Sequence, residues 1–344
     1  MRASRLVIAG VDTHKDFHVV VVLDELGRRV DAGLFASSSE GCNALVAWLC
    51  GLGEPQRVGV EGCGSYGAGL ARVLRSHGIP VVEVCRADRQ LRRRRGKSDE
   101  VDAEAAARAA LSGHQVVTPK SADGPVESMR ALKMARDSAV KARDQTGNQL
   151  HALILTAPCR DRFAEPRIAV LITQLLAAEP GAISDQPGYE VALRSLARRW
   201  RALDTEATGL AAELKQVVSQ AAPAGLLELS GVGPDVAATL MIAAGDNPHR
   251  LRSEASFAAL CGVSPRDCSS GKHTHHRLNR GGNRDANKAL WRIVMVRMRW
   301  DQTTRNYIDK RVRDGKTRRA AIRCLKRYIA GDVYRLLTAP PTPT

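Results

Sequence analysis

The sequence predicts an α/β domain followed by an all-α region. Short β-rich runs alternate with helical patterns through the first third of the 344 residues, two long alanine-rich helical segments follow, and a basic helical region comes last. We expect a mixed-sheet domain over residues 1–122, a helical arm over 123–222, a small helical C-terminal domain over 223–338 and a disordered tail over 339–344.

The first third of the chain reads as a strand meander followed by alternating helices and strands. The β-rich runs 6–11, 18–23 and 29–35 are separated by turns too short for crossovers, which predicts antiparallel pairing. The elements expected next are a helix at about 40–50, a strand at 56–61, a helix at 66–78, a strand at 80–85 and a helix with Ser98 as its N-cap.

The central third carries two long segments of helical periodicity, residues 126–155 and 189–221. Between them the sequence EPGAISDQPG breaks the pattern. Two long helices without chemistry on them indicate an α-hairpin or coiled-coil arm that spaces domains or pairs protomers. A helix pair that only covers a core fits the same pattern equally well.

The charge of the chain points to a polyanionic partner. The formal net charge is +16, and the stretch from Lys272 to Arg327 alone holds eighteen basic residues against four acidic ones, a net +14. A helical face that served only solubility would mix the two signs. We therefore interpret this stretch as nucleic-acid-binding.

The eight cysteines are scattered, with no C-x-x-C pair and no signal peptide, which indicates reduced thiols in the cytoplasm. No run approaches the length of a membrane span, so we expect a soluble protein without a membrane partner.

Four carboxylates stand at positions that the topology brings together. Asp12 ends the first predicted strand and Glu61 the fourth, while Asp99 and Asp102 lie on one face of the first turn of the helix after Ser98. Like charges in one cluster require a cation, and oxygen ligands select Mg²⁺ or, as an alternative, Mn²⁺. Two such ions serve phosphoryl transfer. Taken singly, each acid also fits a turn or a helix N-terminus.

A glycine motif follows the fourth predicted strand. Gly62, Gly64 and Gly67 spell G-x-G-x-x-G, the pattern of a dinucleotide-binding turn, and Glu83 lies near the spacing of a ribose ligand. That fingerprint belongs to the first strand of a βαβ unit, whereas three strands precede it here, and Glu61 would repel a pyrophosphate. We interpret the glycines as the turn from strand to helix and keep nucleotide binding as a disfavoured alternative.

The segment LLELSGVGPDVAATLMIAAGD holds Gly231 and Gly233 in a turn between an apolar helix and an alanine-rich one. It resembles a helix-hairpin-helix, in which glycine amides and a helix N-terminus bind a DNA phosphate. An ordinary glycine turn between packed helices is the alternative.

A basic loop farther along contains Ser269 and Ser270, followed by Gly271 and Lys272. A serine surrounded by cations can attack a phosphodiester, because positive charge stabilises the developing alkoxide. Such loops are common and usually inert. The expected nucleic-acid contacts are Gly231, Gly233, Lys272, His276, Arg277, Arg280, Arg284, Lys288 and Arg292.

The same region contains side chains that could be read as a zinc site, but their spacing matches no standard ligand pattern, so zinc is disfavoured. These residues are Cys261, Cys268, His273, His275 and His276.

Four segments carry a resemblance to a known family. GVDTHKDFHVVVVLD, VGVEGCGSYGAGLARVL, RGKSDEVDAEAAARAAL and AALCGVSPRDCSSGKHTHHRLNRGG, in this order, resemble the insertion-sequence transposases with an N-terminal RuvC-like DEDD domain, of RNase H fold, and a C-terminal serine domain. The resemblance implies that Asp12, Glu61, Asp99 and Asp102 bind Mg²⁺. It also implies that Ser270, directly before the glycine, forms a phosphoserine with DNA and frees a 3′-hydroxyl.

The resemblance further implies DNA and a structured bridge RNA as partners, assembly into dimers and tetramers through the central helices, and a bacterial cytoplasmic, nucleoid-associated location. Two alternatives remain: a RuvC-like metal-dependent nuclease that uses water as its nucleophile, and a non-catalytic nucleic-acid-binding scaffold.

Overall fold

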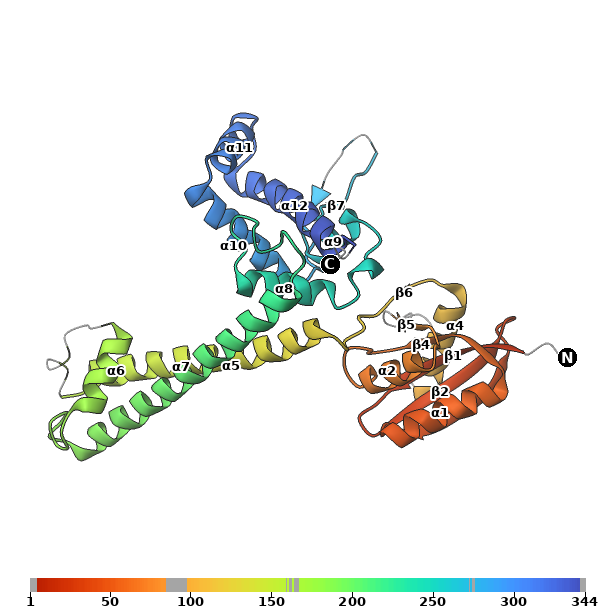
Figure 1. Ribbon diagram of the computed structural model, residues 1–344, viewed down its shortest axis with the longest axis horizontal. Helices are drawn as coiled ribbons and strands as arrows, with labels where there is room; N and C mark the ends of the chain where they lie inside the picture. Colours follow the sequence, from red (N-terminus) through yellow and green to blue (C-terminus); the bar gives the residue numbers. More distant parts are fainter. Residues whose placement is uncertain are drawn as a thin grey trace. The chain divides into compact units, whose positions relative to one another are not determined.

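The computed structural model divides the chain into two compact units (Figure 1). The first unit comprises residues 1–124 and 244–252, and the second comprises 125–243 and 253–344. The structure describes residues 5–340 apart from 85–97, 159, 161–162, 164–166, 272 and 274–275.

The first unit is built on a six-stranded mixed sheet in the order β3-β2-β1-β4-β5-β6. The antiparallel meander of the first three strands is confirmed, and the fourth lies parallel to the first. The last strand was not predicted, because two residues are too few to show a pattern. The strands are β1 (Leu6–Thr13), β2 (Phe17–Asp24), β3 (Arg29–Ala36), β4 (Glu54–Val60), β5 (Val81–Val84) and β6 (Val116–Val117).

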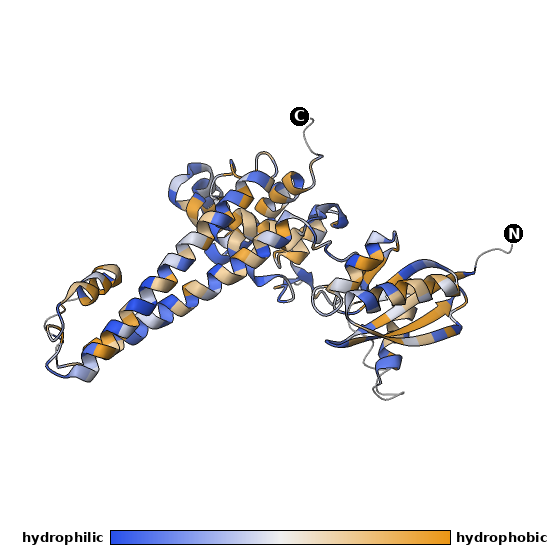
Figure 2. Cartoon of the chain, turned by 60° about the horizontal axis from the view of Figure 1, so that its bottom comes forward, coloured by the Kyte–Doolittle hydropathy of each residue, from blue (hydrophilic) through white to orange (hydrophobic). Residues whose placement is uncertain are grey.

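Helices cover both faces of this sheet. Helices α1 (Ser39–Leu52) and α2 (Ala68–Ser76) bury their leucines against one face, together with Val20 and Val22 of β2. Helix α4 (Asp99–Ser112) packs its alanines against the other face, where alternate residues of β2 point. Hydrophobic residues accordingly concentrate in the strands (Figure 2).

A pair of glycines allows α4 to lie directly on the sheet. Gly10 of β1 and Gly59 of β4 are register partners. A Cβ on Gly10 would lie 2.0 Å from Ala107 N, and one on Gly59 would lie 2.7 Å from Ala106 O. Any side chain at either position would lift the helix. The glycine pair therefore brings the first turn of α4 to the end of the sheet where β1 and β4 terminate.

Residues 244–252 join the first unit from a distant part of the sequence. Asn247 Nδ2 donates to Pro119 O at 3.0 Å, and Asn247 Oδ1 accepts from Ser121 N at 3.1 Å. Arg250 Nε donates to Ala244 O at 3.1 Å. The segment includes the short 3-10 helix η2 (Pro248–Arg250).

The second unit begins with a long helical hairpin. Helices α5 (Pro125–Thr156) and α7 (Pro187–Ala221) run side by side, as the sequence predicted, and their polar and apolar residues alternate along both (Figures 1 and 2). Helix α6 (Ile168–Ala177) was not predicted; it packs on α7 in a leucine-rich cluster at the end of the hairpin. The pairing of protomers through these helices stays a prediction.

The rest of the second unit is a helical bundle with one small hairpin. The expected apolar helix before Gly231 is wrong: residues 224–230 form turns, because Pro223 and the positive φ of +84° at Gly225 end helical geometry after α7. No described helix is long and apolar enough to cross a membrane. The elements are α8 (Pro234–Ala244), α9 (Glu254–Leu260), β7 (Arg266–Asp267), β8 (His276–Arg277), α10 (Arg284–Trp300), α11 (Gln302–Arg313) and α12 (Arg318–Leu337).

Candidate active site

Glu61 is held beside the end of β1 by two backbone hydrogen bonds. Its N–H donates to Val11 O at 3.1 Å, and its carbonyl accepts from Thr13 Oγ1 at 2.8 Å. These bonds bracket Asp12, so Asp12 and Glu61 are neighbours. Gly62 follows with a φ of +75°, which turns the chain from β4 toward α2. The glycine motif thus serves the turn that presents Glu61.

Asp99 and Asp102 lie in the first turn of α4. Ser98 caps this helix, as predicted, by accepting a hydrogen bond from Val101 N at 3.3 Å. The side chain of Asp99 is half-exposed, whereas Asp102 is buried. The glycine pair described above sets the close approach of this turn to the strand ends.

The pKa of Asp12 shows that the other three acids lie near it. We call these four residues the acidic cluster: Asp12, Glu61, Asp99 and Asp102. Burial raises the pKa of Asp12 above its ordinary value, and the charges of Glu61, Asp102 and Asp99 raise it further, while His14 lowers it. A carboxylate in this position requires compensating positive charge.

His14 is the residue that the sequence reasoning missed. Its Nε2 lies 3.3 Å from Asp12 Oδ2 and 3.4 Å from Asp99 Oδ2, yet this buried atom is in hydrogen-bond geometry with neither. Its position two residues after Asp12, where side chains of an extended segment share one face, was the available signal.

The donor set fits a divalent cation. One ligand atom each of Asp12, His14 and Asp99 lies within 4.8 Å of the others. Carboxylate oxygens suit Mg²⁺ and Mn²⁺, and an imidazole nitrogen suits transition metals. A buried ring nitrogen that faces two carboxylates without hydrogen-bonding to them is the arrangement expected of a metal ligand. Glu61 and Asp102 act on Asp12 through their charges but are not among these three close ligand atoms in the part of the chain that the structure describes.

Ser269 and Ser270 lie in a different setting, the segment 266–277, which we call the serine hairpin, and both serines are exposed. Ser270 and His273 exchange both backbone hydrogen bonds at 3.1 Å, and Gly271 takes a φ of +58° between them. The sequence predicted a loop here; the structure adds the short strands β7 and β8. Lys272 and His275 lie outside the described residues.

The two serines differ in their partners. Ser269 N donates to Asp267 Oδ1 at 2.8 Å, and Ser269 Oγ donates a short hydrogen bond to the same oxygen. These bonds hold the pKa of Asp267 below its usual range, with His276 Nδ1 4.0 Å away. Among the described residues, no side chain hydrogen-bonds to Ser270 Oγ.

The cysteines near the hairpin do not favour zinc. Burial raises the pKa of the Cys261 thiol to about 12, so it stays protonated in a setting where a zinc ligand would be a thiolate. Cys268 is exposed on the hairpin itself. Within the ranges that the structure describes, these side chains join no histidines in a metal-ligand group.

Gly231 is partly exposed and lies against helix α10. A Cβ there would lie 3.1 Å from Ile293 O of α10, and Arg297 Nε donates to Ser230 O at 2.7 Å. Gly231 therefore serves close helix packing, while Gly233 is exposed and has open space beside it. The remaining described candidates for nucleic-acid contact are all exposed: His276, Arg277, Arg280, Arg284, Lys288 and Arg292.

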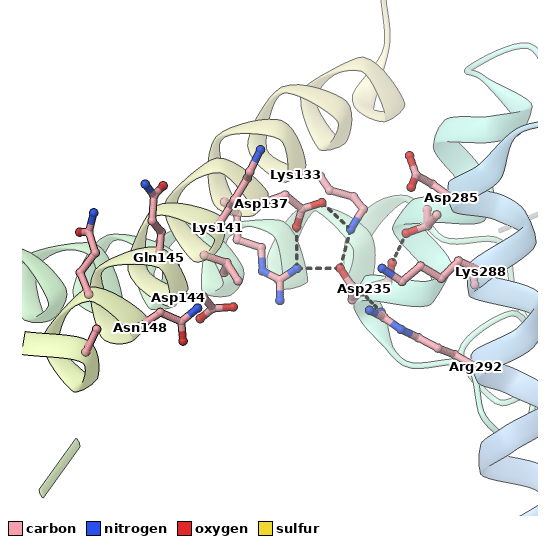
Figure 3. A pocket seen from close by; sticks show the side chains of 16 residues that line it. Lys133, Asp137, Lys141, Asp144, Gln145, Asn148, Asp235, Asp285, Lys288 and Arg292 are labelled. Carbon is pink, nitrogen blue, oxygen red and sulfur yellow. Dashed lines mark hydrogen bonds and ion pairs between the residues drawn. The ribbon is translucent and has the colours of Figure 1, made fainter. Parts of the chain in front are cut away.

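A groove of about 960 Å³ separates α5 from α10 in the second unit (Figure 3). Asp235, in the first turn of α8, lies at its centre. It accepts hydrogen bonds from Lys133 Nζ at 2.7 Å, Arg136 Nη1 at 3.0 Å and Arg292 Nη1 at 2.6 Å. Burial alone would raise the pKa of Asp235, but Lys133 and the two arginines outweigh it and lower the pKa. Asp235 thereby ties the root of the long hairpin to the bundle.

Two family models place the chain in the class of the transposases. The first, a DEDD type described as "Transposase", matches residues 9–157 and contains the whole acidic cluster. The second, described as "Transposase IS116/IS110/IS902 family", matches residues 224–309 and contains the serine hairpin. The chain belongs to this IS110 family.

Curated relatives agree with this assignment. The chain is 29% identical to the transposase for insertion sequence element IS1328 of Yersinia enterocolitica over 59% of each chain. It is 29% identical to a probable family 20 transposase of Pseudomonas aeruginosa over 63% of each chain. A match to an IS110 protein of Streptomyces coelicolor, at 28% identity, covers 43% of this chain and 37% of that protein. The matches therefore span about three-fifths of these relatives' length or less.

Proposed function

We propose that this chain is a DNA transposase that cuts and rejoins strands during movement of an insertion sequence. The observation that carries the proposal is the acidic cluster: a partly buried carboxylate, Asp12, whose pKa is raised by burial and by the charges of three other carboxylates, beside an imidazole nitrogen that makes no hydrogen bond to the carboxylates it faces. The mixed sheet supports a RuvC-like fold for the unit that contains it.

We further propose that Asp12, Glu61, Asp99 and Asp102 bind Mg²⁺, which stabilises negative charge on phosphate oxygens when bound. The chain's own contribution is to fix these carboxylates at the end of the sheet through the Glu61 backbone bonds and the close packing of α4. His14 faces the same cluster, with its Nε2 3.3 Å from Asp12 Oδ2 and 3.4 Å from Asp99 Oδ2.

Ser270 is the proposed nucleophile. Its Oγ would form a bond to phosphorus while the bond from phosphorus to the 3′ oxygen breaks, which leaves a phosphoserine and a 3′-hydroxyl. The hydroxyl proton passes to solvent, and the departing oxygen takes up a proton. Two observations support this choice of serine: Ser269 hydrogen-bonds to Asp267, whereas no side chain of a described residue hydrogen-bonds to the Ser270 hydroxyl.

Target choice by a structured bridge RNA belongs to the same proposal, as do homodimers or homotetramers built through α5 and α7. The net +14 of residues 272–327 supports a polyanionic partner.

Trapping a covalent protein–DNA adduct tests the serine step. The wild type and the matched control Ser269→Ala are expected to form an adduct that survives denaturation, whereas Ser270→Ala forms none. Full strand exchange by Ser270→Ala, with no adduct in the wild type, would favour a metal-dependent nuclease that uses water.

Asp12→Asn separates catalysis from scaffolding. A transposase loses cleavage by at least about a hundredfold when a charge-stabilising group at its active site is removed. A binding scaffold would show no metal-dependent cleavage for the substitution to remove.

A further inference from the structure

An exposed tryptophan stands in the middle of a basic helical face on α10. Arg284, Lys288, Trp291, Met295 and Arg299 recur at a spacing that places them on one side of the helix, and we call this set the α10 stripe. Trp291 is 47% exposed. Exposure alone does not mark a binding surface, because Trp300 at the end of the same helix is 73% exposed; what distinguishes Trp291 is the row of basic residues on its side of α10.

Two cations of the stripe are not used by the fold. Arg292, next to Trp291, pairs with Asp235, and Arg299 lies over the Trp300 ring at 5.1 Å. By contrast, neither Arg284 nor Lys288 has an ion pair or side-chain hydrogen bond with any described residue. Both flank Trp291 toward the N-terminal end of α10, one and two turns away along the helix.

The charge of the helix decides the kind of partner. Helix α10 carries five basic residues and one acidic residue, so a second copy of the same face would meet it with like charge. A polyanion gains from the same charges. The combination of free cations with an exposed aromatic ring is that of surfaces on which nucleobases stack while phosphates meet Lys and Arg.

We propose that the α10 stripe binds an unpaired segment of DNA, with one base stacked on the Trp291 indole and adjacent phosphates contacted by Arg284 and Lys288. Duplex DNA offers phosphates to the same cations but keeps its base faces stacked inside the helix. The inference rests on the proposed function, because strand exchange is the stage at which DNA strands lie unpaired. It assigns a ligand and a stacking residue that cleavage chemistry does not require.

Trp300 is a matched control on the same helix. It is 73% exposed and lies nine residues after Trp291, so the two rings point to opposite sides of α10. Substituting either one removes an exposed indole from one element. Only Trp291 belongs to the stripe.

Fluorescence anisotropy with a labelled oligo(dT) of about 12 nucleotides tests the stacking. Trp291→Ala is expected to weaken binding about tenfold and to leave the salt dependence unchanged, because stacking releases no counterions. Binding to a duplex of equal length should change less than twofold. Trp300→Ala should bind oligo(dT) as the wild type does, and Lys288→Gln should weaken both ligands and lower the salt slope by about one.

Quenching of tryptophan fluorescence gives a second measurement that does not depend on truncating the side chain. Trp291→Phe keeps an aromatic ring and should retain most of the affinity while losing the quenching that oligo(dT) causes; Trp300→Phe should keep that quenching. Equal losses in the two phenylalanine variants, or an equal loss of duplex and oligo(dT) binding in Trp291→Ala, would overturn the proposal.

Two further measurements ask whether the bound strand is DNA or RNA, and whether binding depends on the catalytic residues. Oligo(rU) bound more tightly than oligo(dT) at the same salt concentration would assign the stripe to RNA and contradict DNA as its ligand. Binding is measured without divalent metal and repeated with Ser270→Ala, which should leave it unchanged. A protein that forms no covalent adduct but shows the Trp291 effect would refute the catalytic proposal alone.

Discussion

The acidic cluster and the serine hairpin are held in place by different physical means. The cluster stands where a sheet, a tight glycine turn and a closely packed helix meet, and much of its surroundings is buried core. The hairpin is exposed along residues 265–271 and shaped by a few local hydrogen bonds around Asp267 and Ser270. Under the proposed function, we expect the cluster to be arranged in advance and the hairpin to take its working geometry from bound DNA.

The largest expected effect concerns the contact between α4 and the sheet. Gly10→Ala places a methyl group 2.0 Å from a backbone nitrogen and should destabilise the protein by about 3 kcal/mol, the upper end for overpacking. Thermal unfolding measures it. Gly64→Ala, where an added Cβ meets nothing within 4 Å, is the control. Equal stability of the two variants would show that packing does not fix the cluster.

The second effect concerns the charge of Asp12. Divalent metal at a hundred times its Kd should stabilise the wild type by about 2.7 kcal/mol and Asp12→Asn by much less. Without metal, the difference in stability between the two proteins is expected to reverse, so that Asp12→Asn becomes the more stable one at pH 7. The raised pKa means that ionisation of Asp12 destabilises the folded state as pH rises through that pKa.

Asp12→Asn is therefore expected to unfold at a higher temperature than the wild type at pH 7 without metal, and at a similar temperature at pH 3. Calorimetry at both pH values, with and without Mg²⁺, measures these differences. A metal-free Asp12→Asn protein less stable than the wild type at pH 7 would contradict the strain inferred for the cluster.

The third effect concerns the ion pairs of Asp235, which join α5, α8 and α10 in the second unit. Asp235→Asn leaves Lys133, Arg136 and Arg292 without their shared partner and should cost about 2 kcal/mol, between the exposed and buried limits for ion pairs. Because the pKa of Asp235 is lowered, this stability is present above the unfolded pKa and lost as pH falls through the folded one. A pH-independent difference between variant and wild type would exclude the ion pairs as its cause. Glu228→Gln, in the preceding turns, is the comparison.

The smallest expected effect on stability is that of Asp267→Asn in the serine hairpin, and it tests most directly how the hairpin differs from the acidic cluster. Asp267→Asn removes an exposed carboxylate whose hydrogen bonds stay within the hairpin, so stability should change by less than about 0.5 kcal/mol. Chemical denaturation measures it, and strand cleavage should change more than stability does. A loss as large as that of Gly10→Ala would mean that the hairpin is part of the core.

Local patterns predicted the sheet and the positions of its acids well. The meander and the Ser98 cap each follow from a few adjacent residues. His14 carried a signal two residues from Asp12 that a search for carboxylates alone does not register. The catalytic roles of the cluster and the hairpin stay predictions.

Contacts between distant residues were beyond sequence reasoning. Asp235 meets Lys133 of α5, 102 positions away, and Arg292 of α10, 57 positions away, and no spacing rule joins such residues. The mistaken helix before Gly231 has a local cause, since apolar periodicity was given more weight than Pro223 and Gly225. Gly231 lies against Ile293, a contact that the sequence did not predict, and its contact with phosphate stays a prediction.

The segment 244–252 limits how hybrids between related chains can be made. It crosses back into the first unit, where Asn247 bonds to Pro119 and Ser121, so the two folded units and the two halves of the gene do not coincide. A hybrid made by joining the N-terminal half of one relative to the C-terminal half of another would pair Asn247 with a foreign loop. Working chimaeras are therefore expected to inherit residues 119–121 and 244–252 from the same parent.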